Sequence, residues 1–371
     1  MTAVRHLYVH LPFCAHRCGY CDFVTIVGRR GEHGSYVDAL LGELKLERGV
    51  LAERLDTVFL GGGTPTFTEP LALPRLLAGL PPAEEVTVEA NPETVTAETA
   101  ELLSRNGVDR VSLGAQSFNT ALLAVLERRS GPEGVRQAVH RLRGAGIENI
   151  SLDLLYGIPG QTPADFEQDI DQVLSLEPDH VSAYELEAKR GTRFAHAHGD
   201  ELRRQAEAME GYYEHVVERL ECAGYRWYET ANFCREGREA RHNLGYWLGR
   251  DYLGLGIGAV STVVTERRRN RPGLAGYVAA LAHGRRPPSE VELLDDGTRV
   301  RERLMLGLRL ATPLPLAEVA DAVDSAALER LERTGLVETV GGALRLTRRG
   351  RFLGDAVTVE LMEEVLQKAT I

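Results

Sequence analysis

The chain has few cysteines and no long apolar run. Only five of its 371 residues are cysteines, and three of these fall between positions 14 and 21. Such usage does not suit a disulfide framework and fits a reducing compartment. No stretch of 18 or more apolar residues occurs, which argues against a membrane-spanning helix. The first eleven residues lack the apolar core of a secretory signal. We therefore expect a cytoplasmic protein that meets membranes only peripherally, through partners.

Positive charge is also scarce. The 43 Lys and Arg residues are outnumbered by 54 Asp and Glu, which gives a formal net charge of −11. This balance argues against nucleic acid as a partner, because polyanion binding needs a basic footprint. One short basic cluster, Arg267, Arg268, Arg269 and Arg271, is interpreted as a solvated loop, with a loop that contacts an anionic ligand as the minor alternative.

Short apolar runs alternate with longer amphipathic stretches over the first two thirds of the chain. The apolar runs are His6–Leu11, Thr57–Leu60, Glu85–Glu89, Arg110–Leu113, Asn149–Leu155 and Asp179–Tyr184. The helical patterns between them include Tyr36–Arg48, Ala97–Arg105, Pro132–Ala145 and Pro163–Ser175. Strands alternating with helices of this length predict parallel strands with right-handed crossovers. Six such units predict an α/β fold, a partial (β/α)6 TIM-like barrel, whose chemistry lies at the C-terminal ends of its strands.

The last third follows a different pattern. Glu201–Ala223 is helical in pattern, and a Gly-rich apolar piece follows later, at Tyr252–Val264. Near the C-terminus, a helix at Ala326–Thr334 precedes two short strands joined by a turn at Gly341-Gly342. This order predicts a smaller α+β, winged-helix-like C-terminal domain. We divide the chain into a barrel at 1–225, a connecting region at 226–298 and the C-terminal domain at 299–371.

The three close cysteines form the motif C-x3-C-x2-C, at Cys14, Cys18 and Cys21, directly after the first predicted strand. Three thiolates at this spacing can hold three irons of a cubane cluster and leave the fourth iron open. A zinc site is the alternative, but zinc usually takes four ligands and no second pair lies nearby. The remote Cys222 and Cys234 are interpreted as ordinary thiols.

Polar and glycine motifs follow the later strands in order. They are Gly61-Gly62-Gly63-Thr64-Pro65, Glu89-Ala-Asn-Pro92, Gln116-Ser-Phe118 and Asp153-Leu-Leu-Tyr-Gly157. Together with the cysteine loop, this series resembles the radical S-adenosylmethionine superfamily, in the branch around oxygen-independent coproporphyrinogen III dehydrogenase. The resemblance implies a [4Fe–4S] cluster on the three cysteines and S-adenosylmethionine beside it. The S-adenosylmethionine pocket that it implies is formed by Tyr8, Tyr20, Gly62, Gly63, Thr64, Glu89, Gln116, Arg128 and Asp153.

Two features distinguish members of that branch. The dehydrogenases carry a fourth cysteine, C-x3-C-x2-C-x-C, where this chain has Phe23. The second half contains the motif H-N-x-x-Y-W at His242, Asn243, Tyr246 and Trp247. This motif is similar to that of the HemW haem chaperone family. The resemblance implies haem as cargo, with His242 as an axial ligand.

Two functions therefore stand as hypotheses. The first is a haem chaperone of the radical S-adenosylmethionine superfamily, which delivers haem to acceptor proteins such as membrane respiratory complexes. The resemblance also leaves room for a homodimer. The second is an oxygen-independent coproporphyrinogen III dehydrogenase that uses a 5′-deoxyadenosyl radical. Phe23 and His242 favour the chaperone, and whether S-adenosylmethionine is cleaved in its normal cycle stays open.

Overall fold

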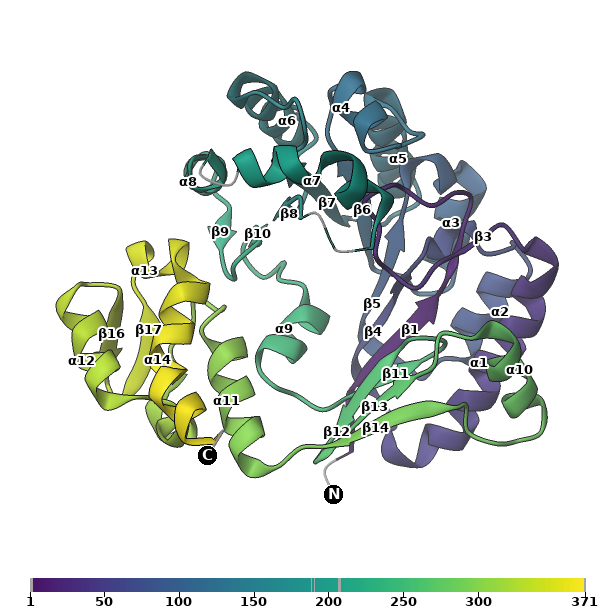
Figure 1. The fold of residues 1–371 in the computed structure, drawn as a ribbon. Helices are drawn as coiled ribbons and strands as arrows, with labels where there is room; N and C mark the ends of the chain where they lie inside the picture. Colours follow the sequence, from purple (N-terminus) through teal and green to yellow (C-terminus); the bar gives the residue numbers. More distant parts are fainter. Residues whose placement is uncertain (1–2, 188, 190, 206–207, 370–371) are drawn as a thin grey trace.

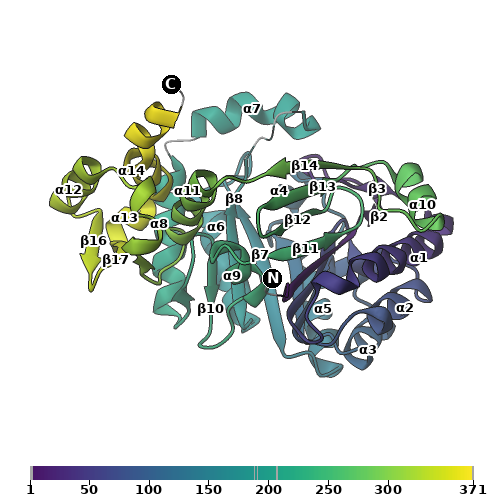
Figure 2. The ribbon, with the colours of Figure 1, turned by 90° about the horizontal axis from the view of Figure 1, so that it is seen from below.

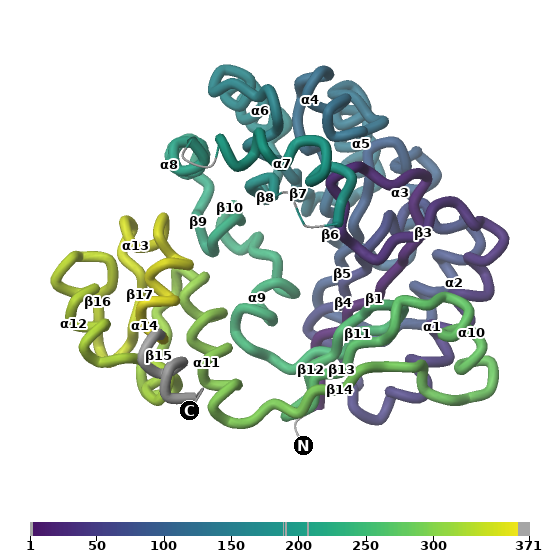
Figure 3. Tube along the Cα trace, in the orientation of Figure 1, coloured from purple at the N-terminus to yellow at the C-terminus, as the bar shows by residue number. Residues whose placement is uncertain are grey.

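The computed structural model describes residues 3–187, 189, 191–205 and 208–369, with side chains through residue 362 (Figure 3). In this part of the chain the main sheet has 12 strands, in the order β14-β13-β12-β11-β1-β4-β5-β6-β7-β8-β10-β9. The strands from β11 to β8 in that order are all parallel. Because the order does not return to its start, the barrel is open, as the sequence predicts.

Six strands and the helices after them make the predicted barrel units (Figure 1). The strands are β1 (His6–Leu11), β4 (Leu55–Gly62), β5 (Ala83–Ala90), β6 (Arg110–Gln116), β7 (Asn149–Tyr156) and β8 (His180–Glu185). The helices are α1 (Arg30–Glu47), α2 (Ala72–Gly79), α3 (Ala97–Arg105), α4 (Thr120–Val125), α5 (Pro132–Gly144) and α6 (Pro163–Ser175). Two short strands, β2 (Phe13–Cys14) and β3 (Ile26–Val27), flank the cysteine loop.

Local sequence sets the starts of the barrel helices. The hydroxyl of Thr96 accepts the N–H of Thr99 and begins α3, and Thr162 forms a capping box with Asp165 at the start of α6. Outward positions on the strands, such as Val88 and Val111, are fully buried against the helices. The core therefore lies between the sheet and its outer helices.

The sequence predicts one helix at Glu201–Ala223, and that prediction is wrong. The chain forms α7 (Arg193–Gln205) and α8 (Met209–Cys222), and residues 206–207 between them lie outside the described residues. Beyond α8, short strands extend the barrel sheet at both edges: β9 (Arg226–Trp227), β10 (Asn232–Cys234), β11 (Tyr252–Leu255), β12 (Val260–Val263), β13 (Glu266–Asn270) and β14 (Ser289–Leu293). The sheet thus continues into region 226–298, and the division at 225 stays a prediction.

Helix α9 (Arg241–Trp247) lies on the concave side of the sheet, opposite the outer helices (Figures 1 and 2). The C-terminal domain faces it from the other side. That domain comprises α11 (Asp296–Gly307), β15 (Leu314–Pro315), α12 (Ser325–Arg333), β16 (Val337–Val340), β17 (Ala343–Leu346), α13 (Arg348–Phe352) and α14 (Gly354–Ala369). The predicted hairpin turn is present, since Gly341 and Gly342 have φ of 60° and 78°. None of the helices in the described residues combines the length and apolarity needed to cross a bilayer.

The basic cluster is mainly a strand, and the sequence interpretation as a loop is wrong for three of its four arginines. Arg267, Arg268 and Arg269 belong to strand β13, and Arg271 lies just after it. Arg267 lies 2.6 Å from Glu302, and Arg268 lies 2.9 Å from the buried Glu47 on α1. Arg267 and Arg268 are therefore engaged in ion pairs within the fold and do not form a solvated basic patch.

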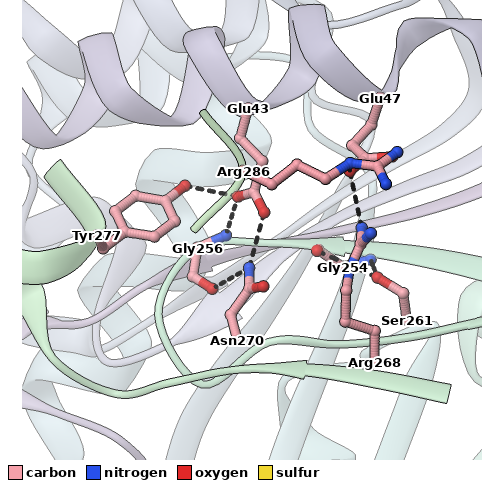
Figure 4. Close-up of polar contacts among 9 residues, drawn as sticks. All are labelled: Glu43, Glu47, Gly254, Gly256, Ser261, Arg268, Asn270, Tyr277 and Arg286. Carbon is pink, nitrogen blue, oxygen red and sulfur yellow. Dashed lines mark hydrogen bonds and ion pairs between the residues drawn. The ribbon is translucent and has the colours of Figure 1, made fainter. Parts of the chain in front are cut away.

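A buried carboxylate on α1 joins that helix to the added strands (Figure 4). Glu43 accepts hydrogen bonds from the hydroxyl of Tyr277 at 2.6 Å, the amide of Asn270 at 2.7 Å and the N–H of Gly256 at 2.9 Å. Tyr277 belongs to α10 (Leu274–Ala282), and Asn270 ends β13. Burial raises the pKa of Glu43, and its three donors oppose that shift.

We expect Glu43→Gln to destabilise the fold by about 1–3 kcal/mol, because an amide N–H₂ would then face buried donors. Urea unfolding of the variant measures the loss. Asp38→Asn is the matched control on the same helix, since Asp38 forms only an exposed pair with Arg75. It should change stability by no more than about 0.5 kcal/mol. Equal effects of the two substitutions would contradict the role given to Glu43.

Candidate functional site

The first candidate site lies at the C-terminal ends of the parallel strands. A cavity of about 150 Å³ is found there. It brings together most of the residues that the sequence analysis expected, namely Cys14, Cys18, Tyr20, Cys21, Gly62, Gly63, Thr64, Glu89, Gln116, Arg128 and Asp153. Residues far apart in the sequence meet because every strand of this set ends at the same edge.

The glycine loop after β4 passes close to the segment that leads into the cysteines. A Cβ atom at Gly63 would lie 2.6 Å from the backbone of Pro12, and one at Gly62 would lie 2.3 Å from the ring of His10. Gly62 also has a φ of 111°, a backbone angle that residues with a side chain rarely adopt. The glycines are therefore required by close packing of these two loops.

The cysteine thiols face one wall of this cavity. The hydroxyl of Thr64 lies 3.5 Å from Sγ of Cys14, and Nη1 of Arg128 lies 3.9 Å from Sγ of Cys18. Burial raises the pKa of Cys14 to about 11 and also raises that of Cys21. Among the described residues, no three His, Cys, Asp or Glu side chains converge on one metal ion. A cubane does not need such convergence, because each cysteine binds a different iron.

Two half-buried carboxylates face the same cavity, one from β5 and one from β7. Oε2 of Glu89 accepts the N–H of Gly62 at 2.9 Å, and Oδ1 of Asp153 accepts the hydroxyl of Ser112 at 3.1 Å. Burial raises the pKa of Glu89 to about 7 and that of Asp153 to about 6. Both carboxyl groups therefore lose their protons near neutral pH. The negative charges that result suit a ligand that carries positive charge.

A half-buried cation, the guanidinium of Arg128, faces the same cavity. Nη2 of Arg128 donates to Oδ1 of Asn91 at 2.8 Å and to the carbonyl of Gly114 at 2.7 Å. Gln116 has a φ of 68° at a bulge in β6, a conformation that is uncommon for residues other than glycine and is often found at functional sites. A guanidinium beside two carboxylates matches a zwitterion such as an amino acid moiety.

The sequence analysis missed Asn91 and Ser112, which also line this cavity. Asn91 donates to Oγ1 of Thr64 and so joins the glycine loop to Arg128. The signal was present for Asn91, which directly follows β5, whereas Ser112 lies within β6 and had none. Tyr8 lies outside the cavity, deeper in the barrel, where its ring stacks on Phe59 with centroids 6.1 Å apart.

The second candidate site is the H-N-x-x-Y-W motif on α9. Glu85 holds the start of this helix, because its carboxylate oxygens accept the N–H groups of Arg241 and His242, each at 3.3 Å. His242 is 1% exposed and has partners at both ring nitrogens. Its Nδ1 lies 2.7 Å from Oγ1 of Thr57, and its Nε2 lies 2.9 Å from the hydroxyl of Tyr246. Burial lowers the pKa of His242 to about 3, so the ring is neutral.

The aromatic end of the motif borders a second, larger cavity. Tyr246 and Trp247 line a space of about 830 Å³ between α9, the added strands and α11. Arg309 lies over the Trp247 ring, 5.3 Å from its centroid. His242 and Asn243 are not among the residues that line this cavity. His242 and Tyr246 are one helical turn apart and in contact, so only the second half of the motif reaches this cavity.

Comparisons with known proteins show which families this chain resembles. The family model of the Radical SAM superfamily matches residues 8–173, and that of the HemN C-terminal domain matches residues 294–353. The chain is 37% identical to the heme chaperone HemW of Mycobacterium tuberculosis, over 96% of this chain and 94% of that protein. It is 33% identical to the heme chaperone HemW of Lactococcus lactis, over 97% and 96% of the two chains.

A solved structure is similar in fold along nearly the whole length. Coproporphyrinogen III oxidase (HemN) from Escherichia coli, described as a radical SAM enzyme, matches with a TM-score of 0.83 and 23% identity, over 97% of this chain and 90% of that one. This likeness confirms the partial barrel with its smaller C-terminal domain. Since relatives above 30% identity align over almost the full length, the chain belongs to the HemW family within the radical S-adenosylmethionine superfamily.

Proposed function

We propose that this protein is a haem chaperone, which binds haem at the H-N-x-x-Y-W motif and delivers it to haem-requiring acceptors. Membrane respiratory complexes are the acceptors that the family resemblance suggests, and a homodimer belongs to the same proposal. The observation that carries it is the placement of Tyr246 and Trp247 on the wall of a cavity of about 830 Å³. Pockets for ligands of this class range from about 300 to 1,000 Å³.

The proposal includes a [4Fe–4S] cluster on Cys14, Cys18 and Cys21, with S-adenosylmethionine beside it. Glu89 and Asp153 suit the positive charges of S-adenosylmethionine, and Arg128 suits its carboxylate. A bound cluster would supply an electron and an open iron. The cavity of about 150 Å³ is small for both groups.

Anaerobic reconstitution with iron and sulfide should give a broad iron–sulfur absorption. We expect the triple variant Cys14→Ala, Cys18→Ala and Cys21→Ala to lose this absorption, because no thiolate remains to hold the irons. Cys222→Ala is the matched control, since Cys222 is exposed at the end of α8 and remote from the loop. Full absorption in the triple variant would refute the cluster site.

Binding of S-adenosylmethionine to the cluster-loaded protein should strengthen as pH rises through about 7. Below that value Glu89, whose pKa burial raises to about 7, is protonated and lacks the charge that attracts the cationic ligand. Isothermal calorimetry on both sides of this pKa measures the change. Glu89→Gln should bind more weakly above the pKa and lose most of the rise, whereas the exposed control Glu101→Gln should keep it. A wild-type affinity that is flat with pH would contradict this role.

Purified protein should bind haem with one site per chain, and His242→Ala should weaken that binding. Nε2 of His242 lies 2.9 Å from the hydroxyl of Tyr246, a residue that lines the cavity, and loss of a group that positions a metal-binding side chain typically costs about 10–100-fold in metal affinity. A haem titration followed by absorbance measures the loss, with the exposed His283→Ala as control. Conversion of coproporphyrinogen III under anaerobic reducing conditions would instead favour the dehydrogenase hypothesis.

A further inference from the structure

We propose that Asp169, a buried carboxylate on α6, is a positioning residue for S-adenosylmethionine and acts through Gln116 without touching the ligand. The inference rests on the proposed S-adenosylmethionine site and extends it beyond its wall, since Asp169 is not among the residues that line the cavity of about 150 Å³. Three observations support it: a strained turn at Gln116, the return of the same segment to the cavity at Arg128, and the hydrogen bonds that join this segment to α6.

The backbone turns sharply where β6 reaches the cavity. Gln116 has a φ of 68°, and the N–H of Ser117 donates to the carbonyl of Ala115 at 2.9 Å, so these three residues form a γ-turn. A γ-turn with a positive central φ is rare and strained. Such a conformation persists only when the surrounding structure fixes it. The place of the Gln116 side chain on the cavity wall therefore depends on what holds the neighbouring residues.

Gln116 and Arg128 share the space above Gly114. A Cβ atom at Gly114 would lie 2.7 Å from Nε2 of Gln116 and 3.3 Å from Nη2 of Arg128. The same Nη2 donates to the carbonyl of Gly114 at 2.7 Å. The segment 114–128 thus leaves the edge of the cavity and returns to it, and each of its ends presents a polar side chain to the proposed ligand.

Asp169 holds the residues directly after the γ-turn. It is 1% exposed, and its carboxylate accepts the hydroxyl of Ser117, at 2.7 Å, and the backbone N–H of Phe118. The Ser117 hydroxyl in turn accepts the N–H of Asn119 at 3.0 Å. Burial raises the pKa of Asp169 to about 6, and its two donors oppose that shift, so the group is charged at neutral pH. Hydrogen bonds to a charged carboxylate are roughly twice as strong as those between neutral groups.

A second carboxylate on α6 holds the start of α4. Oδ1 of Asp165 accepts the side-chain amide of Asn119 at 2.9 Å, and Oδ1 of Asn119 accepts the N–H of Ala121 at 2.9 Å as the N-cap of α4. Asp165 and Asp169 are four residues apart and therefore lie on one face of α6. The two helices follow the neighbouring strands β6 and β7 (Figure 1). Helix α6 is thus the support against which the segment after β6 is fixed.

Binding of S-adenosylmethionine to the cluster-loaded, full-length protein, measured by calorimetry, tests the role of Asp169. Asp169→Ala should weaken the affinity about tenfold, as loss of a group that orients a binding residue does, with the iron–sulfur absorption unchanged. Asp169→Asn should recover most of this loss, because its amide oxygen still accepts the N–H of Phe118. Val173→Ala is the control for a weakened α6, since Val173 is a fully buried core residue one turn further along the helix. It should keep the wild-type affinity.

A double variant shows whether Asp169 acts through the γ-turn. Glycine adopts a positive φ without strain, so Gln116→Gly removes the need to hold this turn. Adding Asp169→Ala to Gln116→Gly should therefore weaken binding less than Asp169→Ala does alone. Ser117→Ala removes only one of the two hydrogen bonds to the carboxylate. It should also weaken binding, and it repeats the test if circular dichroism shows that Asp169→Ala does not fold.

Three results would overturn the inference. They are wild-type affinity in the folded variants at Asp169 and Ser117, the same loss in Val173→Ala as in Asp169→Ala, and an equal further loss when Asp169→Ala is added to Gln116→Gly. A wild-type protein that carries the cluster and does not bind S-adenosylmethionine would instead overturn the proposed S-adenosylmethionine site itself.

Discussion

The inner face of this barrel is polar, and that constraint shapes the rest of the molecule. Along β5, the inward positions hold Glu85, Thr87 and Glu89, while Val88 on the opposite face is buried against helices. Such an interior cannot pack as a dry core, because buried polar groups need hydrogen-bond partners. At the N-terminal ends of the strands the partners come from the segment after β8. At the C-terminal ends the polar groups line the cysteine-loop cavity.

The requirement for partners explains why α9 lies where it does. Glu85 accepts the first N–H groups of α9, Thr57 holds the ring of His242, and His180 lies 2.8 Å from the hydroxyl of Tyr228. These contacts fix the helix inside the open barrel with its aromatic end directed towards α11. The cavity beside Tyr246 therefore forms because α9 is held at the N-terminal ends of the barrel strands.

The two candidate sites share the same strands. Thr57, which holds His242, and Gly62, which borders the cysteine-loop cavity, are five residues apart on β4, or ~16 Å at the usual rise per residue. Glu89 interacts with both sites: its carboxylate accepts the N–H of Gly62, and its charge adds to burial and to Tyr252 in raising the pKa of Tyr246. Charge placed on one site is therefore felt at the other through a poorly solvated interior.

The sequence could predict the first site because its motifs follow strands whose ends must meet. Cys14, Gly62 and Glu89 lie at or next to strand ends, and one topological rule gathers them with Asp153 of β7. It could not predict the cavity beside α9, which forms between segments that no local pattern relates. For the same reason the arginines of β13 were interpreted as a loop. Their partners lie on α1 and α11, so only the folded chain reveals the strand and its ion pairs.

Fold likeness alone cannot separate a chaperone from a porphyrinogen-converting enzyme here, since one barrel supports many functions. The distinction must come from the sites. Phe23, where the dehydrogenases have a fourth cysteine, is 62% exposed and still lines the cysteine-loop cavity. An aromatic ring there offers an apolar surface and no ligand. The cavity beside α9, by contrast, shares no lining residue with the cysteine-loop cavity, so the two candidate sites are separate spaces in the fold.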